Sequence, residues 1–176
     1  MLKSLLLQRR SAILKRWFDA ILETYPPDTH RFLKKQKDRF ANPVGTTLFK
    51  EMEELFQEFV GGFDRERLSA ILDRIIRIRT VQDFSPSGAV GFLFALKGII
   101  RSEVHPESVE GDPANDLLDL ENRIDGLVLL AFDIYMQCRE RVFEIRVKET
   151  QNQVSRLLRK TGMFCELTGS GAPTEP

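Results

Sequence analysis

Residues 115–160 read NDLLDLENRIDGLVLLAFDIYMQCRERVFEIRVKETQNQVSRLLRK, with no proline and one glycine, Gly126. Such a stretch predicts an unbroken helix about 69 Å long, at about 1.5 Å per residue. A compact domain of this chain length has a diameter of only about 40 Å. We therefore expect one part of the helix to build the core and another part to reach a second chain or domain.

An apolar stripe divides this long helix in two. Its members recur at steps of three and four residues: Leu117, Leu120, Ile124, Leu127, Ala131, Ile134, Cys138, Val142 and Ile145. Other apolar residues widen the stripe in the first half, whereas residues 148–153 are the polar run KETQNQ. The pattern predicts that the helix belongs to the domain up to about Val147 and leaves it from Lys148 to Lys160.

Helical periodicity also describes the chain before this stretch. Proline, glycine and capping residues predict about five more helices, the first running from about Ser4 to Tyr25. The predicted N-caps of the next four are Asp28 or Thr29, Thr46 or Thr47, Asp64, and Ser85 followed by Pro86. The helix capped by Asp28 or Thr29 should run to about Phe40, and the helix capped by Thr46 or Thr47 should end at Gly61-Gly62. Residues 105–114 should form a polar loop.

No segment alternates with period two for long enough to predict a strand. The predicted fold is all-α, a globin-like bundle of about six helices with a long C-terminal helix. We expect one domain over residues 1–160 and a disordered tail over residues 161–176, which are rich in Gly, Thr, Pro and Ser.

Composition restricts the classes of partner. The net charge is zero, so the overall charge gives no reason to expect binding to nucleic acid. Residues 1–50 hold 11 Lys/Arg against 4 Asp/Glu, and residues 51–176 hold 15 against 22. We interpret this asymmetry as complementary faces that pack or associate, with an anion- or membrane-binding patch as the alternative.

Targeting signals and thiols point to the cytoplasm. No apolar run approaches the roughly 18 residues of a membrane span. The start, MLKSLLLQRRS, places its charges after the apolar run, which is the reverse of a secretory signal. Cys138 and Cys165 are isolated, so we expect free, reduced thiols in a cytoplasmic protein.

A haem group is not expected. Globin haem needs a proximal histidine, and this chain has only His30, after two prolines, and His105, in the polar loop. Neither lies on the apolar face of a long helix, and Cys138 on the stripe is better explained as a small core residue. We expect no cofactor.

Metal and enzyme sites are not indicated either. The chain has no histidine pair four residues apart and no cysteine cluster. An acidic group surrounds the start of the long helix, where it suits the helix dipole better than a divalent ion: Glu110, Asp112, Asp116, Asp119 and Glu121. No GxSxG motif and no glycine-rich phosphate loop is present, so we predict a protein that is not an enzyme.

Two groups of residues remain as candidate sites. The first, a possible ion-pair or anion site, contains Arg77, Arg79, Asp83 and Asp133. The second could be plain core or could line an apolar ligand pocket, and contains Phe84, Phe92, Phe94, Phe132 and Tyr135. In both cases the structural role is the favoured interpretation.

Four stretches resemble a known family, the RsbRD N-terminal domains, which are input domains of RsbR-type co-antagonists of the kinase RsbT. They are RRSAILKRWFDAILETYP (9–26), FLKKQKDRFANPVG (32–45), IIRIRTVQDFSPSGAVGFLFALK (75–97) and LLAFDIYMQCRERVFEIRVKE (129–149). The resemblance covers about residues 4–160. It implies a globin-related sensory fold without haem that is usually dimeric.

In RsbR-type proteins a linker helix joins this input domain to a STAS domain in the stressosome. Nothing after Lys160 resembles a STAS domain, so we expect a stand-alone form. The resulting prediction is a non-catalytic sensory or interaction domain of stress signalling. It should form a homodimer through the long helix and the first helix and bind an unknown protein partner. The alternative is a carrier or sensor of a small apolar ligand.

Overall fold

The computed structural model describes residues 2–35, 40–104 and 113–160, and it contains no strand in these ranges. The helices are α1 (Leu2–Gln8), α2 (Arg10–Leu22), α3 (Pro27–Lys35), α4 (Pro43–Gly61), α5 (Arg65–Val81), α6 (Pro86–Val90), α7 (Phe92–Glu103) and α8 (Pro113–Lys160). The all-α prediction with a long C-terminal helix is confirmed. The chain divides into two units, Met1–Arg139 and Glu140–Pro176, which we describe separately.

Two helix starts lie where the sequence predicted them. The Asp64 carboxylate accepts hydrogen bonds from the backbone amides of Glu66 and Arg67, at 2.9 and 3.3 Å. The Ser85 hydroxyl accepts from the amide of Gly88 at 3.1 Å, and Pro86 takes the first helical position. Both side chains satisfy amides that have no partner within the helix.

The predicted caps of α3 and α4 are wrong. Asn42 caps α4: its Oδ1 accepts from the amide of Gly45 at 2.8 Å, and its Nδ2 donates to the carbonyl of Leu33 at 2.9 Å. Pro43 takes the first position of the helix, where its missing N–H is not needed. Helix α3 likewise begins at Pro27. Residues 36–39 of the predicted second helix, residues 105–112 of the predicted loop and the predicted tail over 161–176 lie outside the described residues. Phe40 is not helical, and residues 113–114 of the predicted loop instead begin α8.

Two segments predicted as single helices are each divided. The first is interrupted at Arg9, although Arg9 still donates to Leu5 and accepts from Ile13, at 2.9 and 3.0 Å. The other is interrupted at Gly91, whose carbonyl accepts from Phe94 three residues on, at 3.1 Å. In both places most of the helical hydrogen bonding survives, so the sequence pattern carries little sign of the break.

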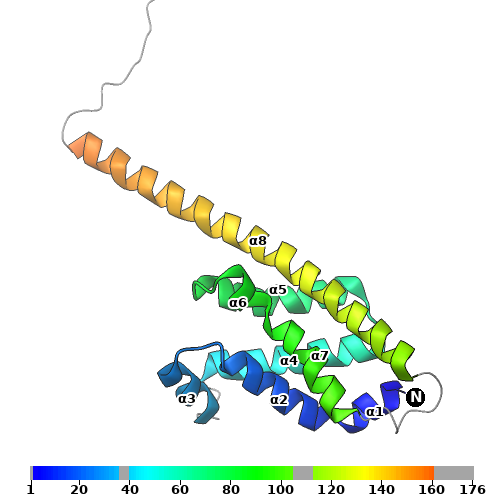
Figure 1. Cartoon of the computed structure of the whole chain (residues 1–176). Coiled ribbons are helices and arrows are strands. Elements are labelled where there is room, and N and C mark those ends of the chain that lie inside the picture. The colour runs from blue at the N-terminus through cyan, green and yellow to red at the C-terminus, as the bar shows by residue number, and fades with distance from the viewer. Residues whose placement is uncertain (1, 36–39, 105–112, 161–176) are drawn as a thin grey trace, which may run out of the picture. The chain divides into compact units, whose positions relative to one another are not determined.

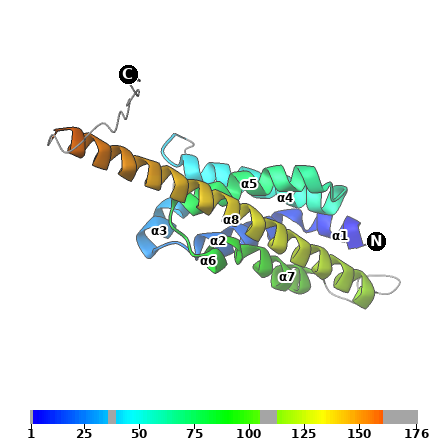
Figure 2. The same ribbon diagram turned by 90° about the horizontal axis from the view of Figure 1, so that it is seen from above.

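The core of the first unit forms where α2 packs on α7 and α4 packs on α5 (Figures 1 and 2). Trp17 is completely buried, and its indole Nε1 donates to the carbonyl of Phe92 at 2.8 Å. Its ring centroid lies 6.0 Å from that of Phe92. This contact joins α2 to the start of α7 across the core.

Residues 113–139 of α8 lie across the bundle between α5 and α7, as Figure 2 shows. The buried residues of this part are Leu120, Glu121, Ile124, Leu127, Val128, Ala131, Ile134 and Tyr135. Two ion pairs attach it to α7: Arg101 holds Glu121 through two bonds of 2.5 and 2.7 Å, and Lys97 contacts Asp125 at 2.6 Å. In the second unit, taken by itself, no side chain from Glu140 to Lys160 is buried, and the domain limit at about Val147 stays a prediction.

Candidate functional site

Arg79 is the charged residue most deeply enclosed in the described part of the chain, with no exposed surface. Its Nε donates to the carbonyl of Ala89 at 3.1 Å, and its Nη2 donates to the carbonyl of Gly88 at 2.8 Å and to the Thr24 hydroxyl at 2.7 Å. The two carbonyls belong to the last turn of α6, where a helix leaves acceptors without partners. Arg79 thus ties α5 to α2 and α6.

Aromatic rings surround the same guanidinium. Its carbon lies 4.1 Å from the ring centroid of Phe84, 5.5 Å from that of Tyr25 and 5.6 Å from that of Phe92. Within the described residues no carboxylate pairs with Arg79, so the ring faces and carbonyl dipoles stabilise its charge. Burial lowers the pKa of Arg79 and raises the pKa of Tyr25, and the proximity of the two groups partly offsets both shifts.

The other members of the predicted anion site lie elsewhere. Arg77 is exposed and pairs with Asp73 at 2.7 Å, and Asp83 pairs with Arg139 at 3.1 Å. Asp133 is exposed on α8. Arg77 and Arg79 diverge because residues two apart on a helix point about 200° apart. The structure therefore does not gather the four residues, and an anion-binding role for them stays a prediction.

The predicted aromatic pocket residues fall into two sets. Phe84 and Phe92 flank Arg79, and the buried Tyr135 donates its hydroxyl to the carbonyl of Phe84 at 2.7 Å. Phe94 and Phe132, which we expected on the most buried segments, are 50% and 43% exposed. A ligand pocket made of all five residues is not tested by this arrangement and stays a prediction.

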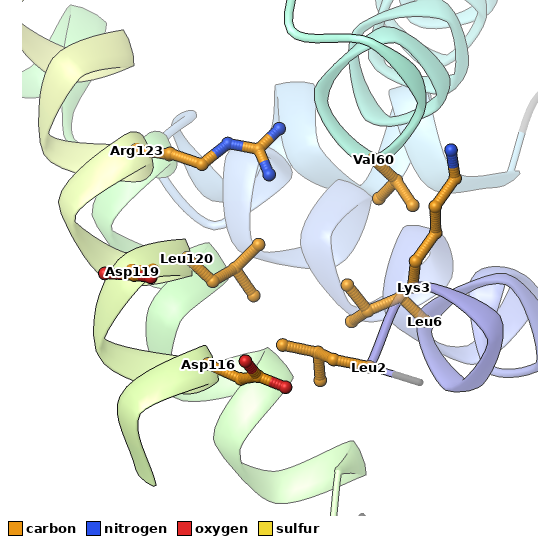
Figure 3. Close-up of a pocket in the computed structure, with 8 residues that line it drawn as sticks. All are labelled: Leu2, Lys3, Leu6, Val60, Asp116, Asp119, Leu120 and Arg123. Atoms are coloured by element: carbon orange, nitrogen blue, oxygen red, sulfur yellow. The ribbon is translucent and has the colours of Figure 1, made fainter. Parts of the chain in front are cut away.

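One pocket of about 230 Å³ lies between α1, the end of α4 and the start of α8 (Figure 3). The residues that line it are Leu2, Lys3, Leu6, Val60, Asp116, Asp119, Leu120 and Arg123. Its apolar part comes from all three helices, and Figure 3 shows Leu2, Leu6 and Leu120 turned toward one another. No pattern in the sequence indicated this pocket.

The cations of this pocket already have structural partners at the C-terminus of α4. Lys3 donates to the carbonyl of Gly61 at 2.9 Å, and Arg123 donates to the carbonyl of Phe59. The Arg123 guanidinium also lies over the rings of Phe59 and Phe63, at 4.9 and 4.6 Å, and burial lowers its pKa. Cations at a helix C-terminus are stabilising. Nothing in the sequence indicated these contacts, because each pair is about 60 residues apart.

Cofactor and metal ligands are not brought together in the described part of the chain. His30 lies half-buried on α3, and His105 is outside the described residues. No group of three His, Cys, Asp or Glu side chains in residues 2–35, 40–104 and 113–160 could hold a metal ion. Among the helices that the structure describes, none is long and apolar enough to cross a membrane.

An apolar surface instead occupies the outer side of α8. We define the outer face as Leu129, Phe132 and Met136, which are 68%, 43% and 49% exposed. Leu129 lies two residues from the buried Leu127 and therefore points to the opposite side of the helix. In the second unit, taken by itself, α8 also exposes large apolar side chains: Phe143, Ile145, Val147, Val154 and Leu157.

These observations define a class: a helical domain with an apolar face exposed on its last helix. Comparison with known proteins then identifies the family of the chain. Residues 11–149 match the family model described as the RsbT co-antagonist protein rsbRD N-terminal domain. The chain belongs to this family, which is regulatory rather than catalytic, and the resemblance noted in the sequence is confirmed.

A relative with an uncharacterised function gives further context. An Archaeoglobus fulgidus protein is 26% identical to this chain over 145 residues, which cover 81% of this chain and 85% of the relative. No solved structure matches the chain. The family assignment therefore rests on the match of residues 11–149 to the family model.

Proposed function

We propose that this chain is a non-catalytic regulatory domain of the cytoplasm that works by association, first with a second copy of itself and then with a partner protein. The observation that carries the proposal is the outer face of α8, made of Leu129, Phe132 and Met136, about half exposed in a single chain. Contiguous apolar surface of this kind typically marks an interaction site. Membership of a family of regulatory input domains supports the same function.

The helical spacing suits a helix of a second copy. Members of the outer face follow one another at steps of three and four residues, as along the seam between two packed helices. Complete burial of a large apolar side chain contributes about 1.5–3 kcal/mol, and burial of the exposed half of each of these side chains would contribute about half of that. Leu7 is also 48% exposed, on α1, the first helix that the sequence predicts to take part in the dimer.

The test is the mass of the protein in solution. Size-exclusion chromatography with light scattering at tens of micromolar should give a dimer for the wild type and a monomer for Met136→Glu. Gln137→Glu is the matched control, because it adds the same charge at the next exposed position of α8, off the outer face. A monomeric wild type, or two variants that behave alike, would contradict the proposal.

A carrier or sensor of a small ligand is the second candidate. The observation that favours it is Nη1 of Arg79, which is buried and has no hydrogen-bond partner in the described part of the chain. Native mass spectrometry of freshly purified protein separates the two candidates. A bare dimer supports the association domain, whereas a retained small molecule supports the carrier.

A further inference from the structure

The turn between α5 and α6, residues 82–85, contains a strained residue. Asp83 has a φ of 57°, in the left-handed region that non-glycine residues seldom adopt. Its amide donates to the carbonyl of Thr80 at 3.2 Å, and the next amide, of Phe84, donates to the carbonyl of Arg79 at 3.3 Å. Strain of this kind persists only where the surroundings hold the backbone in place.

Arg79 and Tyr25 hold the turn from inside the core. The Arg79 guanidinium lies 4.1 Å from the Phe84 ring centroid, and the Tyr25 ring meets the same ring edge to face at 5.0 Å. The Tyr25 hydroxyl donates to the side chain of Gln82 at 2.8 Å. Arg79 and Tyr25, which we call the Arg79 cluster, thus fix the position of the turn.

Helix α8 holds the same turn from the other side. The Tyr135 hydroxyl donates to the Phe84 carbonyl at 2.7 Å, and Arg139 donates to the Asp83 carboxylate at 3.1 Å. Tyr135 is buried and lies one helical turn before Arg139, the last residue of the first unit. One strained turn therefore contacts both the buried arginine and the end of α8 in this unit.

We infer that the α5–α6 turn is a latch, in which the Arg79 cluster sets whether Phe84 and Asp83 hold Tyr135 and Arg139 of α8. A change around Arg79 reaches α8 through the Phe84 ring and its backbone carbonyl. Release of the two contacts frees the stretch of α8 around Tyr135 while the Glu121 and Asp125 ion pairs keep its start attached. The latch acts within one chain and does not depend on dimerisation.

Hydrogen exchange of the full chain, followed by mass spectrometry, tests the latch. Tyr135→Phe keeps the ring and removes the bond to the Phe84 carbonyl. We expect exchange over about residues 129–139 to speed up threefold to tenfold, the range for loss of one hydrogen bond. Exchange over residues 116–127 should stay unchanged. Gln137→Ala, an exposed position on the same helix, is the control and should change neither stretch.

Arg79→Lys supplies the second arm, because lysine keeps the charge but not the planar group with its fork of donors. This variant should speed exchange over residues 129–139 and over the turn. It should do so although, among the described residues, the Arg79 side chain makes its hydrogen bonds and ring contacts with Thr24, with α6 and with the aromatic rings around it, and none with α8. Unchanged exchange at residues 129–139 in Tyr135→Phe would overturn the latch. So would an equal rise over residues 116–127 in either variant, because that indicates general loosening of the fold. The light-scattering mass reports dimerisation separately.

Discussion

The hydroxyl of Tyr135 donates a 2.7 Å hydrogen bond to the backbone carbonyl of Phe84, 51 residues earlier in the chain. This bond joins the buried face of α8 to the turn that leads into α6. Because Phe84 also covers the Arg79 guanidinium, the bond connects α8 to the charged centre of the core.

Tyr135→Phe should lower the free energy of unfolding by about 1–2 kcal/mol, because the substitution leaves a carbonyl without its donor in a part-buried position. Urea unfolding followed by circular dichroism measures the change. Gln137→Ala, on the exposed side of the helix, should change stability by no more than about 0.5 kcal/mol. Equal effects of the two substitutions would contradict this account of the bond.

Arg79→Met should destabilise the protein by about 2–4 kcal/mol, since two carbonyls and a hydroxyl lose their donor inside the core. Arg79→Lys should also be destabilising, because one ammonium group cannot reach all three acceptors. The matched control is Arg77→Met, which removes only an exposed pair with Asp73. If the control costs as much stability as Arg79→Met, burial does not determine the role of Arg79.

Asn42→Ala should cost about 1–2 kcal/mol, because Asn42 both caps α4 and donates to the carbonyl of Leu33 from a buried position. Thr47→Ala, at the exposed position that the sequence suggested as a cap, should have little effect. Thermal unfolding of the two variants under the same conditions gives the comparison. If Thr47→Ala lowers the stability more than Asn42→Ala does, the assignment of Asn42 as the cap of α4 is contradicted.

Alkaline pH should destabilise the protein through Tyr25. Burial raises the pKa of its hydroxyl above the ordinary value of 10.0, so the folded state keeps the proton at a pH where the unfolded state releases it. The contribution of Tyr25 to stability is therefore complete below that ordinary pKa and is lost as the pH rises through the folded pKa. Urea unfolding at rising pH should show a shallower decline for Tyr25→Phe than for the wild type. Identical declines would contradict the prediction.

Local chemistry made part of the fold predictable. Asp64 and Ser85 cap their helices through bonds to amides two or three residues away, so the sequence alone contains the information. Asn42 was missed because an Asn-Pro pair resembles a break as much as it resembles a cap followed by proline at the first position. The interruption at Arg9 keeps its helical hydrogen bonds and leaves no mark in the periodicity.

The candidate site was less predictable because its contacts are distant in sequence. Arg77 lies between Ile76 and Ile78, and Arg79 lies between Ile78 and Thr80, so periodicity could not show which arginine points inward. The Thr24 contact with Arg79 spans 55 residues, and no local pattern encodes it. Phe132 was expected in the core because the apolar residues of α8 form two faces, and the sequence does not distinguish the buried face from the outer one.

Disulfide cross-linking tests the central claim, that the outer face of α8 meets the same face of a second copy, most directly. In a background of Cys138→Ala and Cys165→Ala, Met136→Cys should form a covalent dimer under mild oxidation. Gln137→Cys, one position away and off the outer face, should remain largely uncross-linked. Absence of a covalent dimer in Met136→Cys, or equal cross-linking at both positions, would contradict the account.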